Sequence, residues 1–475
     1  MIKKAQLENG RIIEYIEEMM AEGTMKEVYF SKDKEFALCF YKGDICKTDS
    51  SRLRRLKKIL NEFNPTISTK KNADYWSSLF CWPTGIIIKP KLGVITPVYP
   101  SNFFFASGQF QYQEKKSRWF ISPKLRSYLP TKEQGSWLNY YKICIILARA
   151  ISRLHLAGLA HSDLSDNNVL IDPENGQVII LDIDSLVVPQ VFLPDVEGTP
   201  GYIAPEVLAT LALPVENPRK QFASIRTDQH ALAVLIYEYL LNRHPLRGPK
   251  INSTRSAEED EQLSMGAKAL FIEHPQNTAN HPKEKLKIPV TTLGPILTKL
   301  FYKAFITGLH SPYERPSAYE WERGLIKTWN MFYPCPNPNC SHHWFVVTSK
   351  QRNIRCQFCH TPVRTPFPIL MLYSQKRPGQ WLRHGQLVVY NGQSLFKWHI
   401  FDNVFPGPDT DKTPQAYCAF HQNKWLLINQ TLTSLTSPNG NRVSINQAVE
   451  LKAGSQIRLS QEEHGCIVEV KLLNT

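Results

Sequence analysis

The segment from His161 to Asp184 constrains the fold of this chain more than any other part of the sequence. A polar loop, His161-Ser-Asp-Leu-Ser-Asp-Asn-Asn168, is followed by two short apolar runs, the second of which ends at Asp182. Apolar runs of this length predict a buried β-ribbon, which anchors the loop in a hydrophobic core. The sequence therefore predicts that Asp182 closes a ribbon that begins directly after the loop.

Asp163, Asn168 and Asp182 are residue types that phosphoryl transfer requires. The reaction needs one group to orient the attacking hydroxyl and oxygen ligands to hold Mg²⁺ on the phosphates. Asp163 can face the acceptor while Asn168, five residues later in the same loop, binds a metal ion. Asp182 supplies a second metal-binding carboxylate. We therefore predict these three as catalytic residues, with Asn168 and Asp182 as magnesium ligands.

Three motifs follow the loop: Gly198-Thr-Pro-Gly-Tyr-Ile-Ala-Pro-Glu206, Thr227-Asp228-Gln-His-Ala-Leu and Glu314-Arg315-Pro-Ser. In content and order, the loop and these motifs resemble the eukaryotic-type protein kinase family, whose bacterial members are Ser/Thr kinases. Aminoglycoside and choline kinases have similar catalytic loops, but the downstream motifs separate this sequence from them. Helical patterning predicts, in addition, a long helix from about Ser136 to Leu156.

The resemblance implies an α+β, two-lobed protein-kinase fold. It implies transfer of the γ-phosphoryl group of ATP, with Mg²⁺, to a Ser or Thr of a protein substrate, in intracellular signalling or a stress response. In the family, the helix aspartate (here Asp228) supports the catalytic-loop backbone, and the late arginine (here Arg315) pairs with the glutamate of Ala-Pro-Glu, here Glu206.

Two positions of the catalytic loop depart from the family pattern. Ser162 replaces the arginine that reads a phosphorylated activation loop, so control by loop phosphorylation is not expected. Ser165 replaces a lysine near the γ-phosphate, so we expect a modest rate. Thr199 matches the residue that contacts the catalytic aspartate in Ser/Thr kinases, which favours a Ser or Thr acceptor.

The nucleotide lobe is less orthodox. The stretch Ala21-Glu-Gly23-Thr-Met-Lys26-Glu-Val28 aligns with the glycine-rich loop but keeps only its middle glycine, and Ala37-Leu-Cys39 stands where Ala-x-Lys is expected. In one interpretation the phosphate lysine is lost, and the chain is a pseudokinase scaffold that binds nucleotide or partner proteins. In the other, Lys26 replaces it from the neighbouring strand. This resembles the with-no-lysine kinases, which have a cysteine at the usual lysine position and a lysine inside the glycine loop. We favour the enzyme, because both substitutions occur together and the catalytic residues are intact.

In the enzyme interpretation, the resemblance implies a set of nucleotide contacts: Gly23, Lys26, Val28, Ala37 and Leu170. The acidic partner of the lysine is expected on a basic helix around Arg52 and Lys58, where Glu62 is the best-placed carboxylate. Lys42 is an alternative phosphate lysine, but strand alternation puts it on the face opposite to Cys39.

Four of the ten cysteines lie within 25 residues, and the other six are scattered singly. The clustered four form two knuckles, which resemble those of a zinc ribbon: Cys335, Cys340, Cys356 and Cys359. Four thiolates held in this way make a closed, tetrahedral structural zinc site. The runs His343-Trp-Phe-Val-Val-Thr and Asn353-Ile-Arg between the knuckles are expected to form its strands. Nearby histidines, among them His342 and His360, are expected to be surplus.

The last hundred residues show short strands and Asn-Gly turns, and they resemble a forkhead-associated domain, a β-sandwich that reads phosphothreonine. The best-matching stretches are Lys424-Trp-Leu-Leu-Ile-Asn and Ser437-Pro-Asn-Gly440. In that family a strand-end arginine and a Ser-x-x-His loop bind phosphate, but the arginine is absent after Leu395-Phe-Lys-Trp-His-Ile and no Ser-x-x-His follows. We therefore expect a degenerate forkhead-associated-like sandwich that is used for docking.

The sequence suggests three parts: a protein kinase domain at 1–330, a zinc ribbon at 331–372 and the β-sandwich at 373–475. The net charge of +14 is spread over all of them, which argues against nucleic acid as a partner. With no membrane-length apolar run and no secretory signal, we expect a cytoplasmic protein. Resemblance to kinases of bacterial stress loci implies two partners besides the substrate, a cognate phosphatase and a von Willebrand A-type protein.

Overall fold

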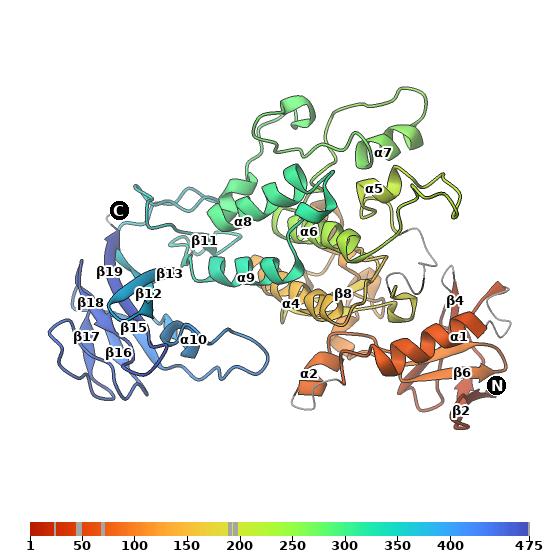
Figure 1. Ribbon diagram of the computed structural model, residues 1–475, viewed down its shortest axis with the longest axis horizontal. Coiled ribbons are helices and arrows are strands. Elements are labelled where there is room, and N and C mark those ends of the chain that lie inside the picture. The colour runs from red at the N-terminus through yellow and green to blue at the C-terminus, as the bar shows by residue number, and fades with distance from the viewer. Residues whose placement is uncertain (23–24, 44–49, 68–71, 189–191, 193–197, 474–475) are drawn as a thin grey trace. The chain divides into compact units, whose positions relative to one another are not determined.

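The computed structural model describes residues 1–22, 25–43, 50–67, 72–188, 192 and 198–473 (Figure 1). Internal contacts divide the chain into two compact units, Met1–Glu284 with Phe301–Glu322, and Lys285–Leu300 with Arg323–Thr475. Over the described ranges, none of the helices combines the length and the apolar character that crossing a bilayer requires.

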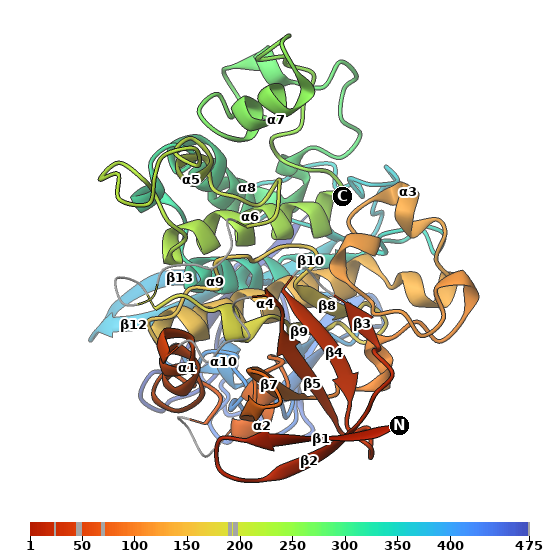
Figure 2. The same cartoon turned by 90° about the vertical axis from the view of Figure 1, so that its right-hand side faces the viewer.

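The first unit begins with a lobe built on a seven-stranded antiparallel sheet, whose strand order is β2-β1-β6-β7-β5-β4-β3 (Figure 2). The strands are β1 (Ile2–Leu7), β2 (Ile12–Ile16), β3 (Ala21–Glu22), β4 (Lys26–Phe30), β5 (Phe36–Tyr41), β6 (Gly85–Lys89) and β7 (Gly93–Pro97). Side chains alternate along β5, so Leu38 and Phe40 enter one core cluster while Cys39 and Tyr41 join another. The second cluster includes Leu56 of helix α1 (Ser50–Lys57), so the helix covers the face that bears Cys39.

The larger lobe of the first unit is mainly helical. Its long helix α4 (Trp137–Leu156) begins at Ser136, whose side chain caps it by accepting a hydrogen bond from the backbone N–H of Asn139. This confirms the long helix that the sequence predicts. The other elements of this lobe, apart from α8 and α9, are α2 (Ala73–Ser77), α3 (Pro123–Arg126), β8 (Val169–Asp172), β9 (Gln177–Ile180), α5 (Pro205–Leu208), α6 (Ile225–Leu241) and α7 (Ala257–Met265). Helix α6 is buried along most of its length, and strands β8 and β9 form the predicted ribbon.

The division between the units falls inside helices α8 (Gly294–Tyr302) and α9 (Ala318–Trp329), whereas the sequence suggested a boundary at residue 330. Hydrogen bonds within the second unit explain the difference. The backbone N–H of Val388 donates to the carbonyl of Asn330, and that of Val347 donates to Met331, both at 2.8 Å. The segment that leaves α9 is therefore bonded to the strands that follow it.

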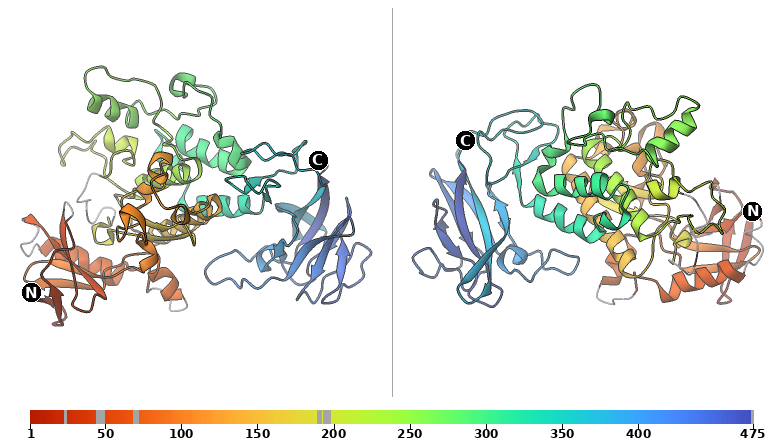
Figure 3. Two further views of the ribbon diagram at one scale, coloured as in Figure 1. Left: turned by 180° about the vertical axis from the view of Figure 1, so that it is seen from behind. Right: turned by 45° about the horizontal axis from the view of Figure 1, so that its top comes forward.

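The second unit continues with a short ribbon and two four-stranded antiparallel sheets, ordered β13-β12-β19-β18 and β14-β15-β16-β17 (Figures 1 and 3). The ribbon pairs β10 (Phe332–Pro334) with β11 (Trp344–Val346). The strands of the sheets, together with helix α10, are β12 (Phe367–Arg377), β13 (Gln380–Val388), β14 (Ser394–Leu395), α10 (Lys397–Ile400), β15 (Ala416–His421), β16 (Lys424–Asn429), β17 (Ala448–Glu450), β18 (Gln456–Arg458) and β19 (Ile467–Leu473). Strand β12 pairs with β19 from Phe367 to Tyr373, so the expected boundary at 372/373 falls within a continuous strand.

Candidate active site

The catalytic loop between α4 and β8 brings two of the predicted catalytic residues together. The Asn168 side-chain amide donates hydrogen bonds to the Asp163 backbone carbonyl and to its carboxylate, both at 2.8 Å. The Thr199 hydroxyl donates to the other carboxylate oxygen at 2.7 Å, which confirms the contact expected for Thr199. The Asp163 carboxylate is therefore held from two sides, so its orientation does not depend on a bound acceptor.

Asp228 of α6 supports this loop from below, as the family resemblance implies. Its carboxylate accepts hydrogen bonds from the backbone N–H of His161 at 2.7 Å and of Ser162 at 3.1 Å. Asp228 is 1% exposed, and the Nε2 atom of His155 lies 3.1 Å from the same carboxylate oxygen that accepts from His161. Ser162 has a φ of +70°, a left-handed conformation that costs free energy in a non-glycine residue. The two charge-assisted hydrogen bonds offset that cost.

Lys26 reaches the end of the ribbon from strand β4. Its ammonium lies 2.6 Å from a carboxylate oxygen of Asp182 and 2.6 Å from one of Asp184. Burial alone lowers the pKa of Lys26, but the carboxylates of Asp184 and Asp182 outweigh it and raise the pKa well above its ordinary value. Burial likewise raises the pKa of Asp182, and the Lys26 ammonium outweighs it and holds the pKa below its ordinary value. The structure therefore places a charged lysine directly on the predicted metal carboxylate.

Strand register explains why Lys26 points this way. Lys26 is paired with Tyr41 on the neighbouring strand, and Tyr41 shares a face of β5 with Cys39. Cross-strand partners project from the same face, so Lys26 enters the space that a lysine at position 39 would enter. Lys42 instead pairs with Glu22.

Glu62 was the wrong prediction for the acidic partner of the lysine. It forms an exposed pair with Lys58, one helical turn away on the same segment, at 3.1 Å. Helix α1 ends at Lys57, and residues 58–62 continue it as a wider π-helical turn that leaves Glu62 on the surface. The carboxylates that meet Lys26 come from the end of the ribbon instead.

A cavity of about 620 Å³ is lined by residues of β4, of β5 and of the segment that follows β7, and it has the size of a small-molecule site. Its lining includes the predicted nucleotide contacts Val28 and Ala37, together with Tyr99, Phe104 and Trp119. Leu170 is fully buried behind this lining, in a cluster against which Tyr99 packs. Gly23 lies outside the described residues. The apolar strip of Val28 and Ala37 suits a flat heterocycle, since both are small and lie on adjoining strands.

The end of the activation segment is held by the predicted ion pair. Both terminal nitrogens of Arg315 donate to Glu206, at 2.7 and 2.6 Å. The guanidinium also donates to the backbone carbonyls of Gly308, Leu309 and Arg226. Arg315 is 2% exposed, so this is a buried, bidentate pair whose remaining donors are satisfied.

Replacing Arg315 by alanine is expected to lower the free energy of unfolding by about 3 kcal/mol, because the change leaves Glu206 and three carbonyls without their donor. Unfolding in urea measures this loss. The matched control is Arg255→Ala, which removes an 85% exposed side chain paired with Glu259. Its expected cost is below about 0.5 kcal/mol. Equal losses of unfolding free energy in the two variants would show that the buried pair stabilises the fold no more than an exposed pair does.

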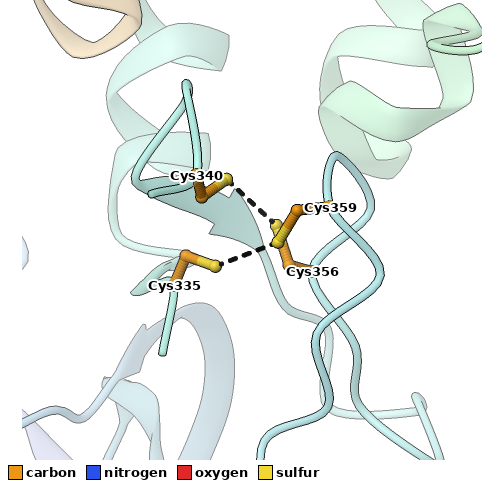
Figure 4. A group of neighbouring side chains, drawn as sticks. All are labelled: Cys335, Cys340, Cys356 and Cys359. Atoms are coloured by element: carbon orange, nitrogen blue, oxygen red, sulfur yellow. Dashed lines mark hydrogen bonds between the residues drawn. The ribbon is translucent and has the colours of Figure 1, made fainter. Parts of the chain in front are cut away.

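The four clustered cysteines converge in the second unit (Figure 4). Their sulfur atoms all lie within 4.8 Å of one another, and the closest pairs are Cys335–Cys359 at 3.4 Å and Cys340–Cys356 at 3.8 Å. Sulfurs bound tetrahedrally to zinc at about 2.3 Å are about 3.8 Å apart, whereas a disulfide is about 2.05 Å long. The spacing therefore fits a metal site and excludes disulfides among these residues.

Backbone turns position the two knuckles. The N–H of Cys335 donates to the carbonyl of His343, and the N–H of Cys356 donates to Thr361. Burial raises the pKa of Cys359, but hydrogen bonds with Thr361, Cys335 and Cys356 together outweigh this and lower the pKa to about 6. The predicted strand at Asn353-Ile-Arg is not formed, since the segment makes only a single bridge between Arg355 and Pro362, and β11 pairs with β10 instead.

A comparison with protein families matches residues 122–320 to the family model described as the protein kinase domain. The matched stretch contains the catalytic loop, Asp182, Glu206, Asp228 and Arg315. Residues 1–121, which include Lys26, lie outside it. Residues 122–320, less than half of the chain, therefore follow the pattern of the protein kinase domain.

Similar curated proteins include the dual serine/threonine and tyrosine protein kinase of Apis mellifera, 29% identical over 123 residues, which covers 26% of this chain and 12% of that protein. Serine/threonine-protein kinase WNG2 of Toxoplasma gondii is 29% identical over 123 residues, covering 25% of this chain and 21% of that protein. Serine/threonine-protein kinase PknD of Chlamydia felis is 27% identical over 173 residues, covering 31% and 17%. The chain thus spans about a fifth or less of these relatives.

Among solved structures, the kinase domain of a Toxoplasma gondii specific rhoptry antigen is similar. It has a TM-score of 0.40 and 14% sequence identity, and the match covers 69% of this chain and 86% of that one.

Proposed function

We propose that this chain, which carries a protein kinase domain, transfers the γ-phosphoryl group of ATP to Ser or Thr residues of a protein substrate. The family match, the similar Ser/Thr kinases and the hydrogen bond between Thr199 and Asp163 support the reaction and the acceptor. The observation that carries the proposal is the contact of Lys26 with Asp182, at 2.6 Å. Lys26 thereby supplies the ammonium group that Cys39 cannot, and this favours the enzyme over the pseudokinase scaffold.

Each side chain then has one role. Asp163, held by Thr199 and Asn168, orients the acceptor hydroxyl and accepts its proton. Lys26 stabilises the α- and β-phosphates, and the cavity with Val28 and Ala37 holds the base. Asn168 and Asp182 offer amide and carboxylate oxygens, the donors that Mg²⁺ prefers, and the Asp182 side chain is 34% exposed and so accessible to an ion. When bound there, Mg²⁺ offsets the phosphate charge.

Lys26→Met is expected to lower the rate of transfer from γ-labelled ATP about a hundredfold, because the phosphates lose their ammonium. Adding Cys39→Lys to this variant is expected to restore part of the rate, since both positions face the same space. Phosphoamino acid analysis of the labelled product identifies Ser or Thr as the acceptor. A Lys26→Met protein with full activity would contradict the role of Lys26. A wild-type protein that binds nucleotide but transfers nothing would favour the scaffold.

We also propose that Cys335, Cys340, Cys356 and Cys359 bind a structural zinc ion within a ribbon at about 331–372. Their thiols are the ligands of closed zinc sites, and the set offers four ligands with spacings that fit a tetrahedron. Histidines are not part of the cluster that the described residues form, in keeping with His342 and His360 as surplus.

For the remaining part, about 373–475, we propose a forkhead-associated-like sandwich that docks a partner protein. Two four-stranded antiparallel sheets support the fold. Helix α10 ends at Ile400, directly before the position where the resemblance leads us to expect an arginine, and its Lys397 pairs with Asp411 at 2.9 Å. A phosphatase and a von Willebrand A-type protein as partners, and a cytoplasmic location, remain predictions.

A further inference from the structure

Helix α1 has no carboxylate to offer Lys26. Its residues, Ser50–Lys57, include arginines and a lysine but no acid. Arg52, which is 8% exposed, lies with its guanidinium 4.8 Å from the centre of the Tyr41 ring. The face of α1 that packs on the sheet therefore carries a cation, whereas the Lys26 ammonium needs a carboxylate as its partner.

Asp184 lies where that acid is needed. One of its carboxylate oxygens is 2.6 Å from the Lys26 ammonium, and the other accepts a hydrogen bond from the Tyr41 hydroxyl. Asp184 is 3% exposed and Tyr41 is 1% exposed. The three residues come from β4, from β5 and from the turn after β9, so the contact joins the two lobes of the first unit through buried side chains.

Asp182 and Asp184 differ in what they can still bind. The side chain of Asp182 is 34% exposed, whereas that of Asp184 is 4% exposed and has both oxygens engaged, one by Lys26 and one by Tyr41. A metal ion bound to Asp182 would compete with the Lys26 ammonium for that carboxylate, because two cations that share one carboxylate repel each other. Asp184 can keep its contact while Asp182 exchanges its own.

We propose that Asp184, steadied by Tyr41, is the positioning residue for Lys26 and takes the part that a carboxylate on helix α1 would otherwise play. Asp182 serves the metal and Asp184 serves the lysine. The placement of the ammonium then depends on the turn after β9 and not on the position of α1. This inference rests on the proposed function, because it assigns Lys26 to the phosphates.

A double-mutant cycle tests the assignment in the full-length protein. The dissociation constant of MgATP is measured by calorimetry for wild type, Asp184→Asn, Lys26→Met and the combined variant. Asp184→Asn is expected to raise the constant tenfold or more in the wild-type background, since the ammonium loses its charge-assisted partner. In the Lys26→Met background the same change is expected to have less than about a twofold effect.

Two further variants separate positioning from a general loss of structure. Tyr41→Phe keeps the ring and removes the hydroxyl, so it is expected to raise the MgATP constant about threefold, again only when Lys26 is present. Glu27→Gln is the matched control, because Glu27 lies beside Lys26 on β4 and pairs with Lys91 at 2.6 Å. It is expected to leave the constant unchanged.

The binding cycle tests the role of Asp184 independently of the phosphoryl-transfer assay. An equal effect of Asp184→Asn in both backgrounds, or none in either, would overturn the assignment. A raised Mg²⁺ requirement in both backgrounds would make Asp184 a metal ligand and would also overturn it. If the cycle shows the coupling while wild type transfers no phosphoryl group, the kinase proposal fails and the assignment of Asp184 stands.

Discussion

Replacing Asp163 by alanine is expected to lower kcat for phosphoryl transfer about a thousandfold while the dissociation constant of MgATP changes less than about threefold. The carboxylate orients the acceptor hydroxyl and takes its proton, and a thousandfold corresponds to about 4 kcal/mol of transition-state stabilisation. Its partners are Asn168 and Thr199, whereas Lys26 contacts other carboxylates. Rates with γ-labelled ATP, compared with calorimetric binding, measure the two quantities.

Asp166→Ala is the matched control for this variant. Asp166 lies three residues further along the same loop, and burial raises its pKa. Among the described contacts, its side chain is not hydrogen-bonded to Asp163 or Asn168, so its removal is expected to change kcat less than about fivefold. A similar loss of kcat in both variants would indicate a disturbed loop and not a catalytic carboxylate. An Asp163→Ala protein with wild-type kcat would contradict the proposed mechanism outright.

Replacing Cys356 by serine is expected to abolish the binding of one zinc ion per chain and to unfold the ribbon around β10 and β11. Structural zinc contributes an apparent binding free energy of about 10–16 kcal/mol in small zinc-binding peptides, most of which is folding free energy. Atomic emission measures the zinc content. Limited proteolysis between Pro334 and Val363 reports the unfolding, because an unfolded loop is cut readily.

The control for the zinc prediction is Cys418→Ser. Cys418 is a buried cysteine of strand β15, outside the four-cysteine cluster. This variant is expected to keep one zinc ion per chain and the protease resistance of the ribbon. A wild-type protein without zinc, or a Cys356→Ser protein that retains it, would contradict a structural zinc site.

The parts of the site that lie within continuous motifs could be predicted from the sequence. Asp163 and Asn168 share one loop, so their contact needs little more than local geometry. The Asp228 and Arg315 contacts could be predicted because the family resemblance supplies long-range pairings that spacing alone does not. Strand alternation also separated Lys42 from the face that bears Cys39, and in the structure Lys42 pairs with Glu22.

The remaining features depend on contacts that local patterns do not reveal. Asp184 and Lys26 are 158 residues apart, and Glu62 was the wrong partner because the π-helical turn after α1 turns it to solvent. In the ribbon that bears the four cysteines, β11 pairs with β10 because the chain before Cys335 is also extended. The start of β12 at Phe367 could not be predicted, since Phe367 pairs with Leu473 of β19, about a hundred residues further along the chain.

A crystal structure with Mg²⁺ and a non-hydrolysable ATP analogue tests the central claim most directly. We expect the Lys26 ammonium to lie within hydrogen-bond distance of the α- or β-phosphate while it keeps its contact with Asp184, and we expect a cation bound by Asn168 and Asp182. A nucleotide bound elsewhere, or Lys26 still on Asp182 with no cation on that carboxylate, would contradict the kinase mechanism and favour a scaffold.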